Sequence, residues 1–374
     1  MVKTEMGILP KIKKPTLLVN ENIALRNIQK MADKAKKSNV CFRPHFKTHQ
    51  SAQIGEWFRK YGITAITVSS VEMAAYFAAN GWADITIAFP VNILEIEHIN
   101  LLASKIKLGL LVEDISVLEF LKKNLSSPID VWIKVDVGYF RTGILWDKKE
   151  SFLLLAEQLR RAKNLNFKGL LTHSGHAYRA STQEEMARIY RETVDRMKVV
   201  RQSLQASGFS PIDISIGDTP CCSVIDDFSE VDEIRPGNFI FYDVSQLKLG
   251  VCSEDQIAVA VACPVVAKHA ERTELVIYGG AIHLSKDFLA DEIGQKVFGL
   301  VCRLHQHVWS KSIDRTFVSA ISQEHGRIKT SPSFFNEVKI GDLLAILPVH
   351  SCLTVNLFNK YLALDGKELL TLQG

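Results

Sequence analysis

The chain has 374 residues, of which 47% are hydrophobic and 23% are charged, and its formal net charge is +4. This composition is typical of a soluble globular protein with room for two domains, and its evenly spread charge argues against nucleic-acid binding. The sequence has no apolar run long enough to cross a membrane and no signal-peptide core, so we expect no membrane association and a cytoplasmic location.

Short apolar runs rich in β-branched residues alternate with helical patterns through the first two thirds of the chain. Each run is followed by a helix or a loop, and no cluster of strands indicates an open sheet edge. The pattern therefore predicts an α/β fold, a parallel TIM (β/α)8 barrel over residues 16–245. The eight strands are expected at residues 40–42, 63–68, 84–88, 106–112, 129–135, 167–172, 212–216 and 233–235.

From about residue 246 the pattern changes to strands separated by turns. Only one helix is expected there, at residues 293–304. This predicts a mostly antiparallel β-domain over residues 246–374, which residues 1–15 are candidates to join. Its strands are expected at residues 257–266, 274–278, 316–321, 343–348 and 353–358.

One lysine, Lys47, is surrounded by basic residues in the stretch V-C-F-R-P-H-F-K-T-H-Q-S. If the chain is extended, Arg43, His45, Lys47 and His49 project from one side. Neighbouring cations disfavour a further positive charge, so the ammonium should release its proton more readily and the neutral amine could form a Schiff base. A basic loop that binds an anion or faces water fits the same residues.

Polar and glycine-rich clusters follow several predicted strands, where active residues of a barrel are found. The turns G-D-T-P and R-P-G-N follow strands seven and eight, the usual place of a phosphate site, although ordinary turns have the same composition. A lysine after the first strand makes a phosphate-bearing cofactor the better interpretation. The candidates are Lys47, Arg141, His173, His176, Tyr178, Gly217, Thr219, Gly237 and Asn238.

A second candidate site is V-H-S-C-L-T-V-N-L at residues 349–357. In a strand, His350 and Cys352 point to the same face, where imidazole and thiolate can bind one metal ion and leave positions open for water or substrate. A buried cysteine beside an exposed histidine is the simpler interpretation of a bare H-x-C.

The motifs R-P-H-F-K-T-H, D-V-G-Y-F-R-T-G, T-H-S-G-H-A-Y and H-S-C resemble those of the pyridoxal-phosphate enzymes related to D-threonine aldolase and eukaryotic-type D-serine dehydratase, which have the alanine-racemase-like fold. The resemblance implies that Lys47 carries the cofactor, and that His173 or His176 assists proton transfer. It also implies a homodimer and a divalent metal at His350 and Cys352, with zinc favoured by the thiolate. The other residues that it implies at the cofactor are Arg141, Tyr178, Gly217, Thr219, Gly237 and Asn238.

These features predict a pyridoxal-phosphate- and metal-dependent lyase of small D-3-hydroxy amino acids, with D-serine converted to pyruvate and ammonia. Retro-aldol cleavage of the D-threonine aldolase type and reactions of 3-hydroxyaspartate stay open. A non-catalytic pyridoxal-phosphate carrier is a different class, but such carriers lack a β-domain and a metal strand. A racemase would need an opposing tyrosine base, which the sequence does not identify.

Overall fold

The computed structural model describes residues 8–374, which divide into two compact units. The barrel unit comprises Gln29–Lys47 and Gly55–Gly237. The β-unit comprises the segment that ends at Ile28, Thr48–Ile54 and Asn238–Gly374. Of the 15 residues proposed to join the β-domain, residues 1–7 lie outside the described part of the chain, and residues 8–15 belong to the β-unit.

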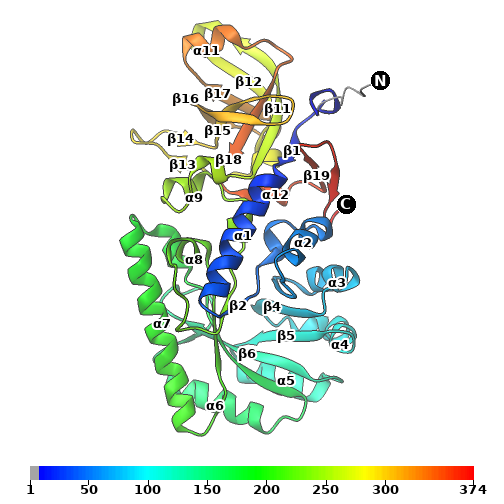
Figure 1. Ribbon diagram of the computed structural model, residues 1–374, viewed down its shortest axis with the longest axis vertical. Helices are drawn as coiled ribbons and strands as arrows, with labels where there is room; N and C mark the ends of the chain where they lie inside the picture. The colour runs from blue at the N-terminus through cyan, green and yellow to red at the C-terminus, as the bar shows by residue number, and fades with distance from the viewer. Residues whose placement is uncertain (1–7) are drawn as a thin grey trace. The chain divides into compact units, whose positions relative to one another are not determined.

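The barrel unit is built on a parallel sheet whose strands follow the order β2-β10-β9-β8-β6-β5-β4-β3 (Figure 1). A parallel bridge between His45 and Thr67 joins the two ends of this order, so the sheet closes into a ring. The predicted parallel barrel and its eight strands are confirmed, with strand ends shifted by a few residues. The strands are β2 (Cys41–Phe42), β3 (Ala65–Val68), β4 (Asp84–Pro90), β5 (Lys107–Val112), β6 (Ile129–Asp136), β8 (Leu165–Leu171), β9 (Asp213–Ile216) and β10 (Glu233–Ile234), and the short β7 (Ile144–Leu145) pairs with β6.

Amphipathic helices connect the strands. The longest, α7, begins after Thr182, whose side chain accepts a hydrogen bond from the backbone N–H of Glu185. Its buried residues include Met186, Ile189 and Met197, which repeat at helical spacing. None of the helices between residues 8 and 374 is long and apolar enough to traverse a bilayer. The helices in this part of the chain are α1 (Glu21–Lys37), α2 (Ala52–Arg59), α3 (Val71–Ala79), α4 (Ile96–Ala103), α5 (Ile115–Asn124), α6 (Lys149–Arg160), α7 (Gln183–Ala206) and α8 (Thr219–Val224).

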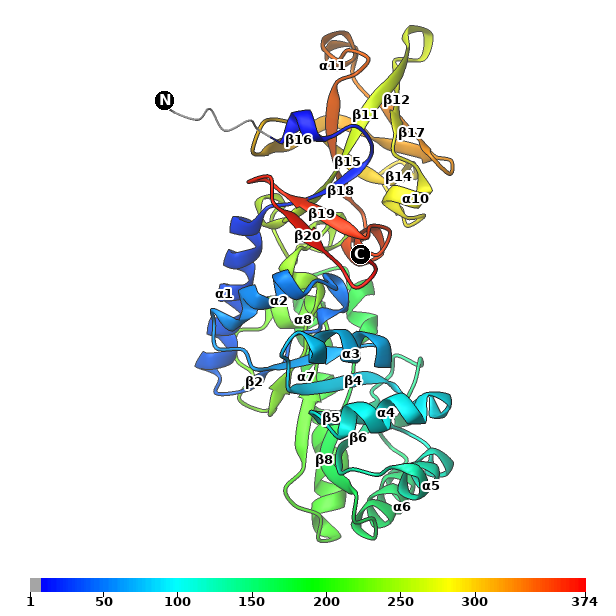
Figure 2. The same ribbon diagram turned by 90° about the vertical axis from the view of Figure 1, so that its right-hand side faces the viewer.

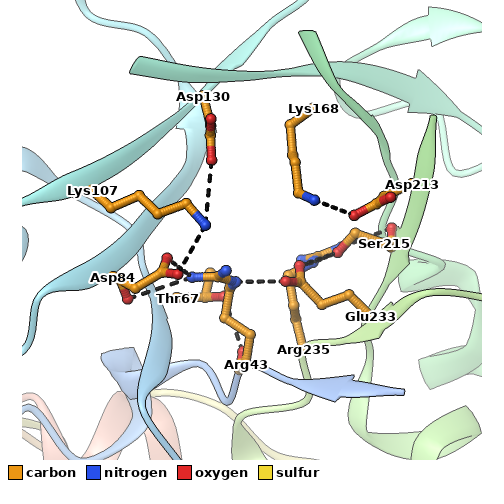
Figure 3. A network of polar contacts seen from close by, with 10 residues as sticks. All are labelled: Arg43, Thr67, Asp84, Lys107, Asp130, Lys168, Asp213, Ser215, Glu233 and Arg235. Carbon is orange, nitrogen blue, oxygen red and sulfur yellow. Dashed lines mark hydrogen bonds and ion pairs between the residues drawn. The ribbon is translucent and has the colours of Figure 1, made fainter. Parts of the chain in front are cut away.

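Charged side chains from neighbouring barrel strands point toward one another in what we call the charge ring (Figure 3). Arg43 is its most buried cation: Nε lies 2.6 Å from Oε2 of Glu233, and Nη1 lies 2.5 Å from Oδ1 of Asp84. Because a buried guanidinium is stable only when it is paired, these carboxylates fix the side chain of Arg43. The ring consists of Arg43, Asp84, Lys107, Asp130, Lys168, Asp213 and Glu233.

The β-unit is a mostly antiparallel sheet in the order β12-β17-β16-β15-β18-β11-β1-β19-β20 (Figure 2). β11 also pairs with β12, which closes the first six strands of this order. The predicted antiparallel domain is thus confirmed. The strands are β1 (Thr16–Val19), β11 (Val259–His269), β12 (Glu274–Tyr278), β15 (Gly299–Leu304), β16 (Trp309–Ile321), β17 (His325–Lys329), β18 (Leu343–Pro348), β19 (Lys360–Ala363) and β20 (Glu368–Leu370), with a separate hairpin of β13 (Leu289–Ala290) and β14 (Lys296–Val297). The helices are α9 (Val244–Lys248), α10 (Ala281–Leu284), α11 (Pro332–Glu337) and α12 (Ser351–Val355).

β1, at the start of the residues predicted for the barrel, pairs antiparallel with β11 and parallel with β19. The backbone hydrogen bonds of Thr16–Val19 therefore belong to the β-unit sheet. The barrel unit ends at Gly237. The sequence of a four-residue apolar run does not show which distant strand it will pair with.

Two elements of the β-domain were predicted wrongly. Residues 293–304 form strands instead of a helix, because the Asp291 carboxylate binds the N–H groups of Ile293 and Gln295 in a turn and Gly299 packs against β18. Residues 353–358 were expected as a strand, but α12 covers Ser351–Val355. Its first turn is held by Asp243, which accepts a hydrogen bond from the N–H of Ser351 at 2.9 Å.

Candidate active site

The chain around Lys47 turns instead of staying extended. β2 ends at Phe42, and Phe46–Thr48 form a turn of 3₁₀ helix, η2. The ring of Phe46 is fully buried, with centroids 4.9 Å from Phe58 and 5.0 Å from Trp82. This anchor fixes the turn that presents Lys47, and the expectation that four basic side chains share one side of an extended strand is wrong.

Basic side chains at the ends of four barrel strands influence the pKa values of two histidines, His45 and His173. Burial lowers the pKa of His45 well below its usual value, and the charges of Lys47, Arg235, His173 and Arg141 lower it further. Burial likewise lowers the pKa of His173, with added effects of Lys134, Arg141 and Lys47. We call His45, Lys47, Lys134, Arg141, His173 and Arg235 the cationic cluster. Such a concentration of positive charge favours anionic ligands.

Arg141 is placed by the loop that follows β6. One carboxylate oxygen of Asp136 accepts hydrogen bonds from the N–H groups of Gly138, Tyr139 and Phe140 at 2.8, 2.9 and 3.1 Å. The guanidinium of Arg141 lies 5.1 Å from the ring centre of Tyr139. Oδ1 of Asp136 thus holds the backbone of the loop that carries Arg141.

The two histidines after β8 have different surroundings. Nδ1 of His173 lies 2.5 Å from the carbonyl oxygen of Gly217. Because a carbonyl can only accept, Nδ1 carries the hydrogen, and Nε2 of the neutral ring keeps its lone pair. Burial lowers the pKa of His176, and the charge of Arg196 lowers it further. Glu192 and Asp136 have smaller opposing effects.

The turn after β9 has the features of a phosphate site. A Cβ atom on Gly217 would lie 2.8 Å from the backbone of Arg235, so only glycine allows this approach. The buried Thr219 hydroxyl oxygen finds no hydrogen-bond partner among residues 8–374. The N–H of Thr219 donates to the Tyr178 hydroxyl at 3.3 Å, which places Tyr178 at the same turn. An unpaired buried hydroxyl is costly unless a ligand completes it, and a phosphate oxygen is a suitable acceptor.

Two buried cations of the cationic cluster were missed by the sequence reasoning. Burial, with the charges of Arg235 and Arg141, lowers the pKa of Lys134 to about 7. Burial lowers the pKa of Arg235 to about 10, and its Nη2 donates to the carbonyl of Thr172 at 2.5 Å. The available signal was a charged residue inside or directly after an apolar strand, in I-K-V-D and E-I-R-P.

His350 and Cys352 interact through their side chains, although they lie at the start of α12 instead of on a strand. His350 is the residue before the helix, with an extended backbone, and Cys352 is in the first turn. Burial alone would lower the pKa of His350, but the hydrogen bond and charge of Cys352, with smaller effects of Asp243 and Asp287, raise it to about 9. Across residues 8–374, no three His, Cys, Asp or Glu side chains are grouped to hold a metal ion. The pair alone supplies imidazole and thiolate, a donor set that suits zinc.

Asn238 takes part in the surroundings of Cys352. Its side-chain amide donates to Asp243 at 2.7 Å and to the Ser351 hydroxyl at 2.9 Å, and lies 3.7 Å from Sγ of Cys352. The Thr48 hydroxyl lies 3.4 Å from the same sulfur. Thr48 and Asn238 directly follow Lys47 and Gly237 in the chain, so residues next to two predicted cofactor-binding positions contact the predicted metal ligand.

Comparisons with known proteins agree with this description. The family model of the alanine racemase N-terminal domain matches residues 19–244, and a serine dehydratase domain model matches residues 258–364. D-serine dehydratase from Dictyostelium discoideum is 29% identical, over 93% of this chain and 92% of the relative. The structure of D-threo-3-hydroxyaspartate dehydratase from Delftia sp. HT23 has a TM-score of 0.90 at 25% identity and covers 97% of this chain and 98% of its own. A variant of that dehydratase in a metal-free form also has a TM-score of 0.90, at 23% identity and the same coverage.

The first model spans more than half of the 374-residue chain, and the second matches in the part that folds as the β-unit. The resemblance inferred from the lysine motif is thereby confirmed. The chain belongs to the family of the alanine racemase N-terminal domain, in the branch that carries a serine dehydratase domain.

Proposed function

We propose that this protein is a pyridoxal-phosphate-dependent lyase of small D-3-hydroxy amino acids, with D-serine as substrate and pyruvate and ammonia as products. The observation that carries the proposal is the barrel unit's combination of an amine, Lys47, in a cationic cluster with a glycine turn whose buried Thr219 hydroxyl lacks a partner among the described residues. The D-serine dehydratase similar over most of the chain supports the same substrate class.

The residues fit the cofactor. Gly217 and Thr219 would bind its phosphate, with Gly237 and the backbone of Asn238 in the second glycine turn, and Lys47 would hold its aldehyde carbon. Tyr178 and Arg141 would lie beside it. When bound, pyridoxal phosphate supplies an electron sink that makes a proton at the substrate α-carbon easier to remove.

Proton transfer is assigned to two groups of the chain. We assign removal of the α-proton to the amine of Lys47. Of the two histidines, we assign the second transfer to His173, because its Nε2 has a free lone pair and its ring belongs to the cationic cluster. Arg141 stays positively charged, so a ring nitrogen that faces it would remain unprotonated.

His350 and Cys352 fit a divalent metal, and we propose zinc. When bound, the metal acts as a Lewis acid that makes a β-hydroxyl a better leaving group. Two protein ligands would leave the metal open to further donors. A thiolate ligand favours zinc over harder ions, and the metal-free form described for the related dehydratase supports metal dependence.

Borohydride reduction of cofactor-saturated protein, followed by peptide mapping, tests the central claim. We expect the pyridoxyl label on Lys47, and a label elsewhere would refute the proposal. Assays with D-serine, D-threonine and D-threo-3-hydroxyaspartate then separate the outcomes. Pyruvate from D-serine supports dehydration, glycine from D-threonine indicates retro-aldol cleavage, and no product from any of them indicates a cofactor carrier.

The two guanidinium groups of the cluster, Arg141 and Arg235, give a specific reason to include 3-hydroxyaspartate, which brings a second carboxylate. Its dehydration would yield oxaloacetate in place of pyruvate. We further propose a homodimer, as the resemblance implies, and a cytoplasmic location, where a reducing compartment would keep Cys352 as a thiol. Sedimentation analysis of the purified protein tests the dimer.

A further inference from the structure

A carboxylate outside the predicted metal pair contacts one of its members. Oδ2 of Asp287 lies 2.8 Å from Nδ1 of His350. Both side chains are partly exposed, at 46% and 39% of their surface, so the contact is open to solvent on one side. Asp287 was not among the residues that the sequence singled out.

This contact decides which ring nitrogen is available to a metal. A carboxylate accepts hydrogen bonds, so Nδ1 of His350 must carry the hydrogen. In the neutral imidazole, which is the form that binds metals, the lone pair is then on Nε2. A histidine ligand that donates its other N–H to a carboxylate has a fixed orientation and a more basic ligating nitrogen.

The backbone around Asp287 holds this carboxylate in place. The N–H of Asp287 donates to the Ser285 hydroxyl at 3.2 Å, which forms a tight turn after α10. The Thr354 hydroxyl, on α12, donates to the carbonyl of Leu284 at 3.0 Å and is buried. Since His350 directly precedes α12, this bond ties the segment that carries Asp287 to the segment that carries the imidazole.

We infer that Asp287 is a positioning residue for the metal site: it holds Nδ1–H of His350, so that zinc binds Nε2 of His350 together with the sulfur of Cys352. The inference rests on the proposed function, because it requires a metal at this pair. It adds a residue that acts on the metal through the imidazole and does not itself bind the metal.

Zinc affinity of the cofactor-loaded protein tests the inference without reference to turnover. Wild type, Asp287→Ala and Asp287→Asn are stripped with a chelator and titrated with zinc against a chromophoric competitor. We expect the zinc Kd of Asp287→Ala to rise by about 10- to 100-fold, the usual effect of losing such a partner. Asp287→Asn should fall in between, because its amide oxygen still accepts Nδ1–H but without charge. Asp314→Ala, which removes a 94%-exposed carboxylate from the same unit, is the matched control and should leave the Kd unchanged.

A second measurement locates the metal. In protein with ¹⁵N-labelled histidine, loaded with cadmium-113, the metal coupling of His350 should appear on Nε2 while Nδ1 keeps its hydrogen. Coupling to Nδ1, or a Kd of both Asp287 variants within twofold of wild type, would overturn the inference. If His350→Ala binds zinc as tightly as wild type, the proposed metal site itself fails, whatever the Asp287 variants do.

Discussion

At the scale of single residues, the two histidines after β8 differ in a way that can be tested directly. Asparagine at position 173 can still donate to the Gly217 carbonyl, so the turn should survive while the free Nε2 is lost. We expect His173→Asn to lower kcat by about 100-fold or more, a typical loss for a general acid–base group.

His176→Asn is the matched control, since the charges that shift the pKa of His176 come from Arg196, Glu192 and Asp136 and not from the cationic cluster. It should stay within a few-fold of wild type in keto-acid production. An equal loss in both variants, with cofactor absorbance retained, would contradict the assignment of proton transfer to His173.

Thr219 offers a second residue-scale prediction, in which one substitution has two opposite effects. Its buried hydroxyl is unpaired among the described residues, so Thr219→Val should raise the free energy of unfolding of the cofactor-free protein by about 1 kcal/mol. The same change should weaken cofactor binding at least tenfold, because a phosphate contact is lost. Urea unfolding and absorbance titration with cofactor measure the two effects.

Thr193→Val is the control for this experiment, because the buried Thr193 hydroxyl lies 2.9 Å from that of Ser174. This substitution should destabilise the protein and leave cofactor affinity unaltered. A Thr219→Val protein with wild-type cofactor affinity would exclude Thr219 from the phosphate site.

At the scale of elements, Asp218, the residue before α8, links pH to stability. Asp218 accepts the N–H of Cys221 at 2.7 Å, and burial raises its pKa from 3.8 to about 6, against smaller opposing effects. Between these two values the folded protein binds more protons than the unfolded chain, so the contribution of Asp218 to stability falls as the pH rises. Asn caps a helix equally well and cannot ionise, so Asp218→Asn should gain stability relative to wild type between pH 4 and pH 8, by up to about 3 kcal/mol.

Asp114, which precedes α5, should make stability depend on pH in the opposite direction. Its hydrogen bonds with Ser116 lower the pKa of its carboxyl, so its contribution is present at neutral pH and is lost as the pH falls. Asp114→Asn should therefore lose stability relative to wild type as the pH rises from 3 to 7. Denaturant unfolding of cofactor-free protein at several pH values compares the two variants, and parallel curves would show that Asp218 is ionised normally.

At the scale of the whole molecule, the proposed chemistry needs two bound groups, a cofactor held by Lys47 and a metal held by His350 and Cys352. Removal of the metal with a chelator should therefore abolish keto-acid release while the visible absorption of the bound cofactor remains. Zinc should restore turnover. Full turnover of a protein that contains no metal by elemental analysis would eliminate the metal from the mechanism.

Much of the fold follows from local patterns. Most of the eight barrel strands could be predicted because they are short runs rich in apolar β-branched residues, which reflects burial on both faces of a parallel sheet. The pairing of Thr16–Val19 with the β-unit could not, because it depends on hydrogen bonds to residues at least 240 positions away. The strand at Gly299–Leu304 could not be predicted either. Its apolar residues fit both a helix and a strand, and it forms a strand because it pairs with β16 and β18.

The sequence by itself determined the candidate chemistry, because Lys47, the glycine turns and the His350–Cys352 spacing are local motifs that survive even where the predicted backbone was wrong. Only the tertiary structure decided the surroundings of these groups. The hydrogen bond to Gly217 sets the tautomer of His173, the charges of Lys134 and Arg235 act on the same histidines as that of Lys47, and Asp287 contacts His350. The physical reason is that the charge, burial and hydrogen-bond partners of a group depend on residues distant in the chain, whereas its chemical identity depends on one residue.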